Sequence, residues 1–147
     1  MKPRIMFAPV SMGGQGIMLA ETLRDRGYET CSVEYVPTFL GYNADCVSPG
    51  DSVEEVTKFA GEMFTKAQDY DVIVFDFGCS FYTMPFWNRQ LGNNKSMFWD
   101  IEELRDKDKI IFMMFHGSDI RTMSELYAHY WDFNNITMPD APSQRTD

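Results

Sequence analysis

The sequence predicts an α/β domain whose mostly parallel sheet is covered by helices on both faces. Short apolar runs of strand length alternate along the 147 residues with segments whose apolar side chains recur at helical spacing. The strand-like runs are apolar throughout, and strands without polar alternation are typical of sheets that are buried on both faces. Because 44% of the residues are hydrophobic and 24% are charged, the chain can bury one core of this kind.

The first three elements form a strand–helix–strand unit. Residues 4–10 predict a strand that runs into a turn with glycines at positions 13, 14 and 16. Residues 17–26 follow as a helix, which Gly27 ends, and residues 29–36 form the second strand. Residues 37–50 contain prolines and glycines without periodicity, so we expect a long loop on the ligand side of the sheet.

The most regular helix of the sequence covers residues 53–67. Apolar residues recur there at helical spacing, and Ser52 with Glu55 forms a capping box in front of them. Residues 71–77 then predict a buried strand that ends in Gly78.

The remaining elements continue the alternation. Residues 83–91 are predicted as a short helix and residues 109–115 as the fourth strand. We expect a Rossmann-like, three-layer α/β/α domain over residues 1–133 and an extended tail over residues 134–147. A last helix is predicted from the helical spacing of Met123, Leu126, Tyr127, Tyr130 and Trp131.

The charge balance excludes one class of partner. The formal net charge is −9, with 13 Lys and Arg against 22 Asp and Glu and no basic run. A nucleic-acid partner requires a basic face, so we predict none.

The number and spacing of the cysteines, together with the hydropathy of the chain, indicate the cellular compartment that we expect for the protein. Cys31, Cys46 and Cys79 are odd in number and lack CxxC spacing, which favours reduced thiols and a cytoplasmic protein without a metal site. We expect each cysteine to serve as a small buried hydrophobic residue. No apolar run approaches the roughly 18 residues that a membrane span requires.

Three predicted strand ends carry residues that suit a ligand site. In an open parallel α/β sheet, ligands bind outside the carboxyl ends of the strands, where glycines let the backbone approach a phosphate or a sugar. We predict His116 as the catalytic residue, since its ring can titrate and donate hydrogen bonds. The predicted substrate-binding residues are Gly13, Gly14, Gln15, Gly78, Ser80, Gly117, Ser118, Asp119 and Arg121.

A purely structural interpretation of these residues stays open. Glycines permit tight turns, and Ser118 or Asp119 can cap a helix. The glycine turn lacks the third glycine of a GxGxxG dinucleotide motif, and it lacks the Gly-Lys-Ser/Thr ending of a nucleotide-hydrolase phosphate loop.

The residues also resemble a known family, the amino-terminal domain of GT-B fold glycosyltransferases, in particular the retaining, family 4-like group. The similarity includes Ala-Pro before the glycine turn, the helix end over residues 19–29, the strand over residues 71–78, and Phe-His-Gly-Ser-Asp-Ile-Arg at residues 115–121. The sequence departs from the family at Asp76, where relatives often have histidine.

The resemblance implies a transferase that moves a hexosyl group from a nucleotide-sugar to a saccharide or lipid acceptor, as in polysaccharide biosynthesis. This domain would hold the acceptor, while Gly13, Gly14 and His116 would also face the donor. Asp119 and Arg121 would order the His116 loop or touch the substrate. The nucleotide-sugar would be a co-substrate, and no further cofactor is implied.

The length leads us to expect a fragment. A complete GT-B enzyme has a second domain that binds the nucleotide diphosphate, and we expect that domain in cis or in trans, with peripheral membrane contact in the parent protein. The chain alone is then expected to be inactive. The alternative is a non-catalytic, flavodoxin-like module that binds a phosphate or a nucleotide, or that presents exposed aromatic residues such as Phe98 and Trp99 to a partner.

Overall fold

The computed structural model describes residues 1–36, 41–84, 89–90 and 98–116. The chain divides into two compact units, Met1–Phe115 and His116–Asp147. The predicted last helix and the tail lie outside the described residues. The described residues belong to the first unit, except His116, which begins the second.

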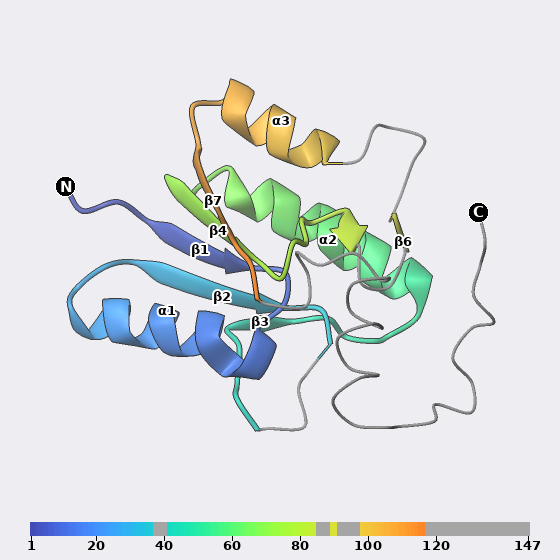
Figure 1. Cartoon of the computed structure of the whole chain (residues 1–147), viewed down its shortest axis with the longest axis horizontal. Coiled ribbons are helices and arrows are strands. Elements are labelled where there is room, and N and C mark those ends of the chain that lie inside the picture. Colours follow the sequence, from blue (N-terminus) through green and yellow to red (C-terminus); the bar gives the residue numbers. More distant parts are fainter. Residues whose placement is uncertain (37–40, 85–88, 91–97, 117–147) are drawn as a thin grey trace, which may run out of the picture. The chain divides into compact units, whose positions relative to one another are not determined.

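A five-stranded, entirely parallel sheet forms the centre of this unit, in the order β3-β2-β1-β4-β7 (Figure 1). The predicted α/β class with a parallel sheet is therefore confirmed, and the arrangement is compatible with a Rossmann-like fold. The strands are β1 (Ile5–Ala8), β2 (Thr30–Glu34), β3 (Cys46–Val47), β4 (Val72–Asp76) and β7 (Ile110–Met114).

Helices cover both faces of the sheet (Figure 1). Helix α1 (Gln15–Asp25) lies on one face, and α2 (Val53–Ala67) and α3 (Trp99–Asp106) lie on the other. Successive residues of a strand point to opposite faces, so β1 contributes to two cores. Met6 and Ala8 belong to the larger core with residues of α2 and α3, whereas Ile5 and Phe7 belong to the smaller core with Ala20 of α1.

The predicted capping box is confirmed at the start of α2. The Ser52 hydroxyl oxygen accepts a hydrogen bond from the Glu55 amide at 3.3 Å, and the Glu55 carboxylate accepts one from the Ser52 amide at 3.4 Å. The apolar stripe predicted for this helix faces the larger core, as shown by Val56, Phe59, Ala60, Met63 and Ala67.

The described residues of the helix predicted over residues 83–91 are extended. Thr83–Met84 (β5) instead pairs antiparallel with Arg89–Gln90 (β6). Pro85 explains the difference, because a residue before proline is driven out of the helical region into an extended conformation.

Two short elements were not predicted from the sequence. Helix α3 has low overall apolar content, and only Leu104 and Asp100 are buried in it. Strand β3 lies inside the predicted loop of residues 37–50 and is two residues long, which is too short to show any periodicity.

The prediction that all strands are buried on both faces is wrong for β7, which lies at an edge of the sheet. Ile111 and Met113 pack against the larger core, but Ile110 and Phe112 on the opposite face are 55% and 57% exposed. Helix α1 packs on β1 and β2, and no other described helix covers β7 on that face.

Trp99, expected to be exposed, is half-buried. Its ring lies 5.5 Å from that of Phe64 and 4.9 Å from that of Tyr82, measured between ring centroids. This aromatic cluster attaches the start of α3 to α2 and to the turn after β4.

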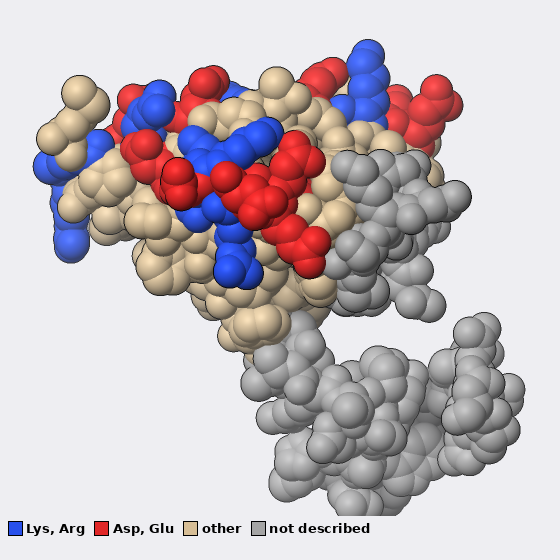
Figure 2. Space-filling view, turned by 90° about the horizontal axis from the view of Figure 1, so that it is seen from above, with Lys and Arg blue, Asp and Glu red and all other residues tan. Residues whose placement is uncertain are grey.

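The molecular surface carries mixed charges on the face shown in Figure 2. Lysine and arginine side chains lie beside aspartate and glutamate side chains there, without a large area of a single sign. Among the described residues, no helix combines the length and the apolar character that crossing a membrane requires.

Candidate functional site

The topology of the sheet indicates where a ligand is expected to bind. From β1 the chain continues to β2 on one side, and from β4 it continues by way of α3 to β7 on the other side. The connections therefore diverge between the carboxyl ends of β1 and β4, and ligands of open α/β sheets bind at such a switch point. The predicted residues Gly13, Gly14, Gln15 and Gly78 all follow these two strand ends.

The glycine turn after β1 consists of one short helical turn, Met12–Gly14, that leads into α1. Gly13 and Gly14 have φ angles of +62° and +76°, a conformation that favours glycine. A Cβ atom on Gly13 would meet nothing within 4 Å, whereas one on Gly14 would lie 2.4 Å from the Tyr42 ring. Gly13 thus leaves its backbone open to approach, and Gly14 makes room for Tyr42.

The amides of this turn are partly satisfied by the chain itself. The Met12 amide donates to Asp76 Oδ2 at 3.1 Å, and the Ile17 amide donates to Ser11 Oγ at 3.3 Å. The Gly14 amide donates to the Ser11 carbonyl oxygen at 3.1 Å. The amino terminus of α1 therefore has fewer amides available for a phosphate than the glycine pattern alone indicates.

Asp76 sets the electrostatic character of the switch point. This aspartate ends β4, is 1% exposed, and reaches across to the turn after β1. Residues 9–17 and 76–80 contain no lysine or arginine. A carboxylate can accept hydrogen bonds from the hydroxyl groups of a ligand, and the predicted cation of the site, Arg121, lies outside the described residues.

A tight turn places Gly78 directly after β4. Phe77 and Gly78 both have positive φ angles, +58° and +62°, and the Cys79 amide donates to the Asp76 carbonyl oxygen at 3.1 Å. A left-handed conformation is costly for a phenylalanine, and such residues persist where the surrounding structure holds them. Phe77 is 8% exposed and packs in the larger core, which supplies that support.

Ser80 has a structural role in this turn. Its side chain is fully buried, and its hydroxyl donates to Asp100 Oδ1 at 2.9 Å and accepts from the Thr83 amide at 3.2 Å. The Tyr82 amide donates to Asp100 Oδ2 at 3.2 Å. Burial raises the pKa of Asp100, although these hydrogen bonds oppose the shift. The network fixes the turn after β4 to the start of α3.

The third predicted loop is described only at its beginning. His116 follows the last residue of β7 by two positions and is half-buried. Gly117, Ser118, Asp119 and Arg121 lie outside the described residues. That the loop after β7 lies close to the turns after β1 and β4 therefore stays a prediction.

Sequence reasoning missed two residues of the switch point. For Tyr42, one sequence feature could have indicated a role in the site: it is an aromatic residue in a loop otherwise rich in small and polar residues. For Asp76, the feature is a charged residue at the end of an apolar strand. Neither signal indicated that these side chains pack on the glycine turn.

No protein-family profile, curated protein or solved structure matches this chain. Among the described residues, no group of three histidine, cysteine, aspartate or glutamate side chains is placed to hold a metal ion.

Proposed function

We propose that this chain is the acceptor-side domain of a GT-B type glycosyltransferase and that it binds a saccharide, or the sugar part of a lipid, at the switch point. The observation that carries the proposal is the pairing of an open glycine turn with a buried carboxylate at that point. The fold class is compatible with the domain, and the Phe-His-Gly-Ser-Asp-Ile-Arg sequence at residues 115–121 supports it.

We assign the acceptor rather than the donor to this domain, as the resemblance implies. A nucleotide-sugar carries a diphosphate, whose binding usually relies on arginine, lysine or a metal ion. Residues 9–17 and 76–80 contain no lysine or arginine, and the predicted cation Arg121 lies outside the described residues. The exposed Gly13 backbone and the Gln15 side chain can instead form hydrogen bonds with hydroxyl groups.

Sugar transfer then requires a second domain. The acceptor hydroxyl oxygen bonds to the anomeric carbon, the bond from that carbon to the diphosphate oxygen breaks, and the departing diphosphate takes up the hydroxyl proton. Both substrates must therefore be held together. This chain contributes acceptor binding and orientation, with His116 as the predicted residue nearest to the reaction. We expect the isolated chain to bind acceptors without turning over a nucleotide-sugar.

Amide NMR spectra of the isotope-labelled chain test the proposal. The chain is titrated with neutral mono- and disaccharides, with a soluble glycolipid and with nucleotide-sugars. We expect neutral saccharides to shift the amides of residues 11–16 and 76–80, and nucleotide-sugars to shift them less. Binding of nucleotides without saccharides would overturn the proposal in favour of a nucleotide-binding module, and binding of neither ligand would also contradict it.

Two glycine variants separate the site from the fold. Gly13→Ala places a methyl group on the open turn, and Gly27→Ala introduces the same backbone conflict at φ +78° at the other end of α1. Both variants lose comparable stability, on the order of 1 kcal/mol. Only Gly13→Ala is expected to weaken saccharide binding, and His116→Ala tests separately whether the third loop participates.

A further inference from the structure

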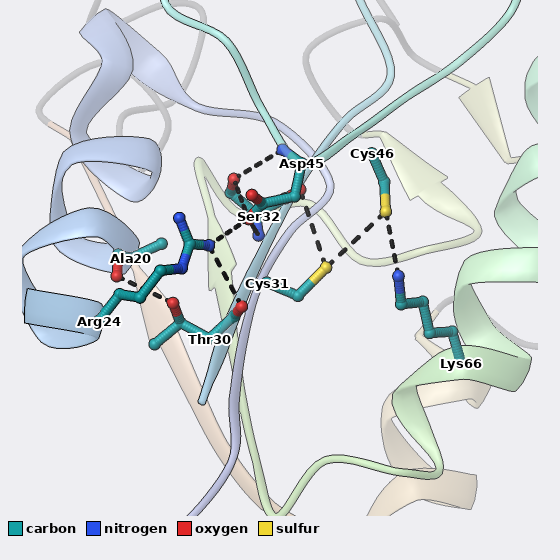
Figure 3. A network of polar contacts seen from close by, with 8 residues as sticks. All are labelled: Ala20, Arg24, Thr30, Cys31, Ser32, Asp45, Cys46 and Lys66. Carbon is teal, nitrogen blue, oxygen red and sulfur yellow. Dashed lines mark hydrogen bonds and ion pairs between the residues drawn. The ribbon is translucent and has the colours of Figure 1, made fainter. Parts of the chain in front are cut away.

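A second cluster of reactive side chains lies where β2 and β3 meet the end of α2, on the side of the larger core. Cys31 stands near the start of β2, Cys46 begins β3, and Lys66 lies in the last turn of α2 (Figure 3). The two sulfur atoms are 3.8 Å apart, and Lys66 Nζ lies 3.2 Å from Cys46 Sγ. Both cysteines are free thiols in this structure.

A polar network holds Cys46 in this position. The neighbouring Asp45 accepts hydrogen bonds at its Oδ2 from Arg24 at 2.7 Å and from the Ser32 amide at 2.8 Å, as Figure 3 shows. The Asp45 amide in turn donates to Ser32 Oγ at 3.0 Å. Because these bonds join the chain before Cys46 to the strand that carries Cys31, the approach of the two sulfurs is built into the fold.

The contacts distinguish the roles of the two thiols. Cys46 receives the hydrogen bond from the Lys66 ammonium and is half-buried, so it is the more exposed of the two cysteines and the one whose sulfur contacts a cation. Cys31 is 3% exposed, and burial together with the adjacent Cys46 raises its pKa to about 11. Cys31 therefore keeps its proton at neutral pH and can donate it toward Cys46.

The charged and titratable groups around the pair are few. Lys66 faces Cys46 from α2, and its hydrogen bond to Cys46 raises the pKa of Lys66. The Tyr70 hydroxyl lies against Cys31, and burial raises the pKa of Tyr70. Glu29 acts on Tyr70 from the start of β2. Lys66 is thus the positive group that acts directly on Cys46.

We propose that Cys46 and Cys31 form an oxidisable dithiol site, in which a hydroperoxide oxidises Cys46 and Cys31 resolves the product into a disulfide. The Cys46 thiolate attacks a peroxide oxygen, the O–O bond breaks, and the departing oxygen takes up a proton to leave as an alcohol or as water. Cys31 then attacks the Cys46 sulfenic acid, an S–S bond replaces the S–O bond, and the departing hydroxide takes the Cys31 proton as water. Two electrons pass from the thiols to the hydroperoxide.

Closing this disulfide requires a small movement. The sulfur atoms must approach from 3.8 Å to about 2 Å. Strand β2 pairs with strands on both sides and is buried, whereas β3 is a two-residue edge strand. We therefore assign the movement to β3 and the residues before it.

Peptide mapping of the full chain tests the site. The reduced protein is treated with increasing hydrogen peroxide, the remaining thiols are alkylated in acid, and the fragments are identified by mass spectrometry. We expect a Cys31–Cys46 cross-link that dithiothreitol removes, while Cys79 stays reduced, because Cys79 is fully buried and its thiol is hydrogen-bonded to the Phe77 carbonyl oxygen. Oxidation of Cys79 at the same rate as Cys46, or the absence of the cross-link, would overturn the proposal.

Variants test the assigned roles. In Cys31→Ser, a sulfenic acid should accumulate at Cys46 and be trapped by dimedone, whereas Cys46→Ser should leave Cys31 unoxidised. Lys66→Gln should slow oxidation of Cys46 about tenfold, because the sulfur loses the ammonium group that lies 3.2 Å from it. Lys58→Gln, an exposed lysine on the same helix, is the matched control and should leave the rate unchanged. Equal rates in the two lysine variants would contradict the role of Lys66.

Discussion

Asp76 connects two strand ends through a hydrogen bond. Its carboxylate accepts from the Met12 amide at 3.1 Å, and the aspartate side chain is 1% exposed. Removing the acceptor of such a part-buried bond costs the stability that the bond contributes. The residue therefore matters for the shape of the glycine turn before any ligand is present.

Replacing Asp76 measures this contribution. Asp76→Ala should lower the free energy of unfolding by about 1–3 kcal/mol in urea denaturation, because the Met12 amide loses its partner. Asp76→Asn keeps an oxygen that can accept the hydrogen bond, so its free energy of unfolding should decrease less than that of Asp76→Ala. Asp69→Ala removes an exposed aspartate and should change stability by no more than about 0.5 kcal/mol. If Asp76→Ala and Asp69→Ala have the same stability, the bond does not hold the turn.

At the scale of elements, Asp100 joins α3 to the turn after β4. Its carboxylate accepts from the Ser80 hydroxyl and the Tyr82 amide, and the side chain is fully buried. Burial raises the pKa of Asp100 above its ordinary value of 3.8. The unfolded chain therefore releases this proton at a lower pH than the folded chain.

The direction of the resulting pH dependence follows from proton binding. Between 3.8 and the raised pKa, the folded state binds more protons than the unfolded state, so stability decreases as the pH rises through this range. Asp100→Asn removes this effect. Its stability relative to wild type should increase with pH across the range, measured by urea denaturation at a series of pH values.

A matched variant gives the reference for this measurement. Asp106→Asn removes an exposed carboxylate from the same helix. A pH-independent difference between Asp100→Asn and Asp106→Asn would show that Asp100 does not titrate with a raised pKa in the fold.

The elements that sequence reasoning predicted correctly are those whose local signal agrees with their tertiary contacts. Helix α2 has both an apolar stripe and a capping box, and β4 is apolar at four of its five positions. In the helix predicted over residues 83–91, the described residues are extended instead, and Pro85 accounts for Met84 because it disfavours helical geometry at the residue before it. Helix α3 was missed because its attachment depends on Trp99, Leu104 and the buried Asp100 rather than on a continuous apolar stripe.

At the scale of the whole molecule, the position of the candidate site was predictable, but its chemistry was less so. Parallel strands place their carboxyl ends on one edge of the sheet, so glycines after β1 and β4 could be expected to approach each other. The packing of Tyr42 on Gly14 depends on the path of a loop without periodicity. The bond from Met12 to Asp76 spans 64 positions and has no local signal at all.

The sheet as a whole is unevenly covered, and this asymmetry has a measurable consequence. Phe75 in β4 is fully buried in the larger core and packs against Phe81 with ring centroids 5.2 Å apart. Phe112 in the neighbouring β7 points to the opposite face and is 57% exposed. The two residues are thus chemically identical and lie in adjacent strands, but they differ in the apolar surface that folding removes from water.

Alanine substitution of each phenylalanine should therefore give very different losses of stability. Phe75→Ala leaves a cavity in the core and should cost about 3–5 kcal/mol, or prevent folding. Phe112→Ala removes a side chain that keeps more than half of its surface in water, and it should cost less than about 1.5 kcal/mol. Urea denaturation followed by circular dichroism measures both values. A loss for Phe112→Ala as large as that for Phe75→Ala would mean that the outer face of β7 is covered in the folded protein, and the edge of this sheet would then have to be counted as core.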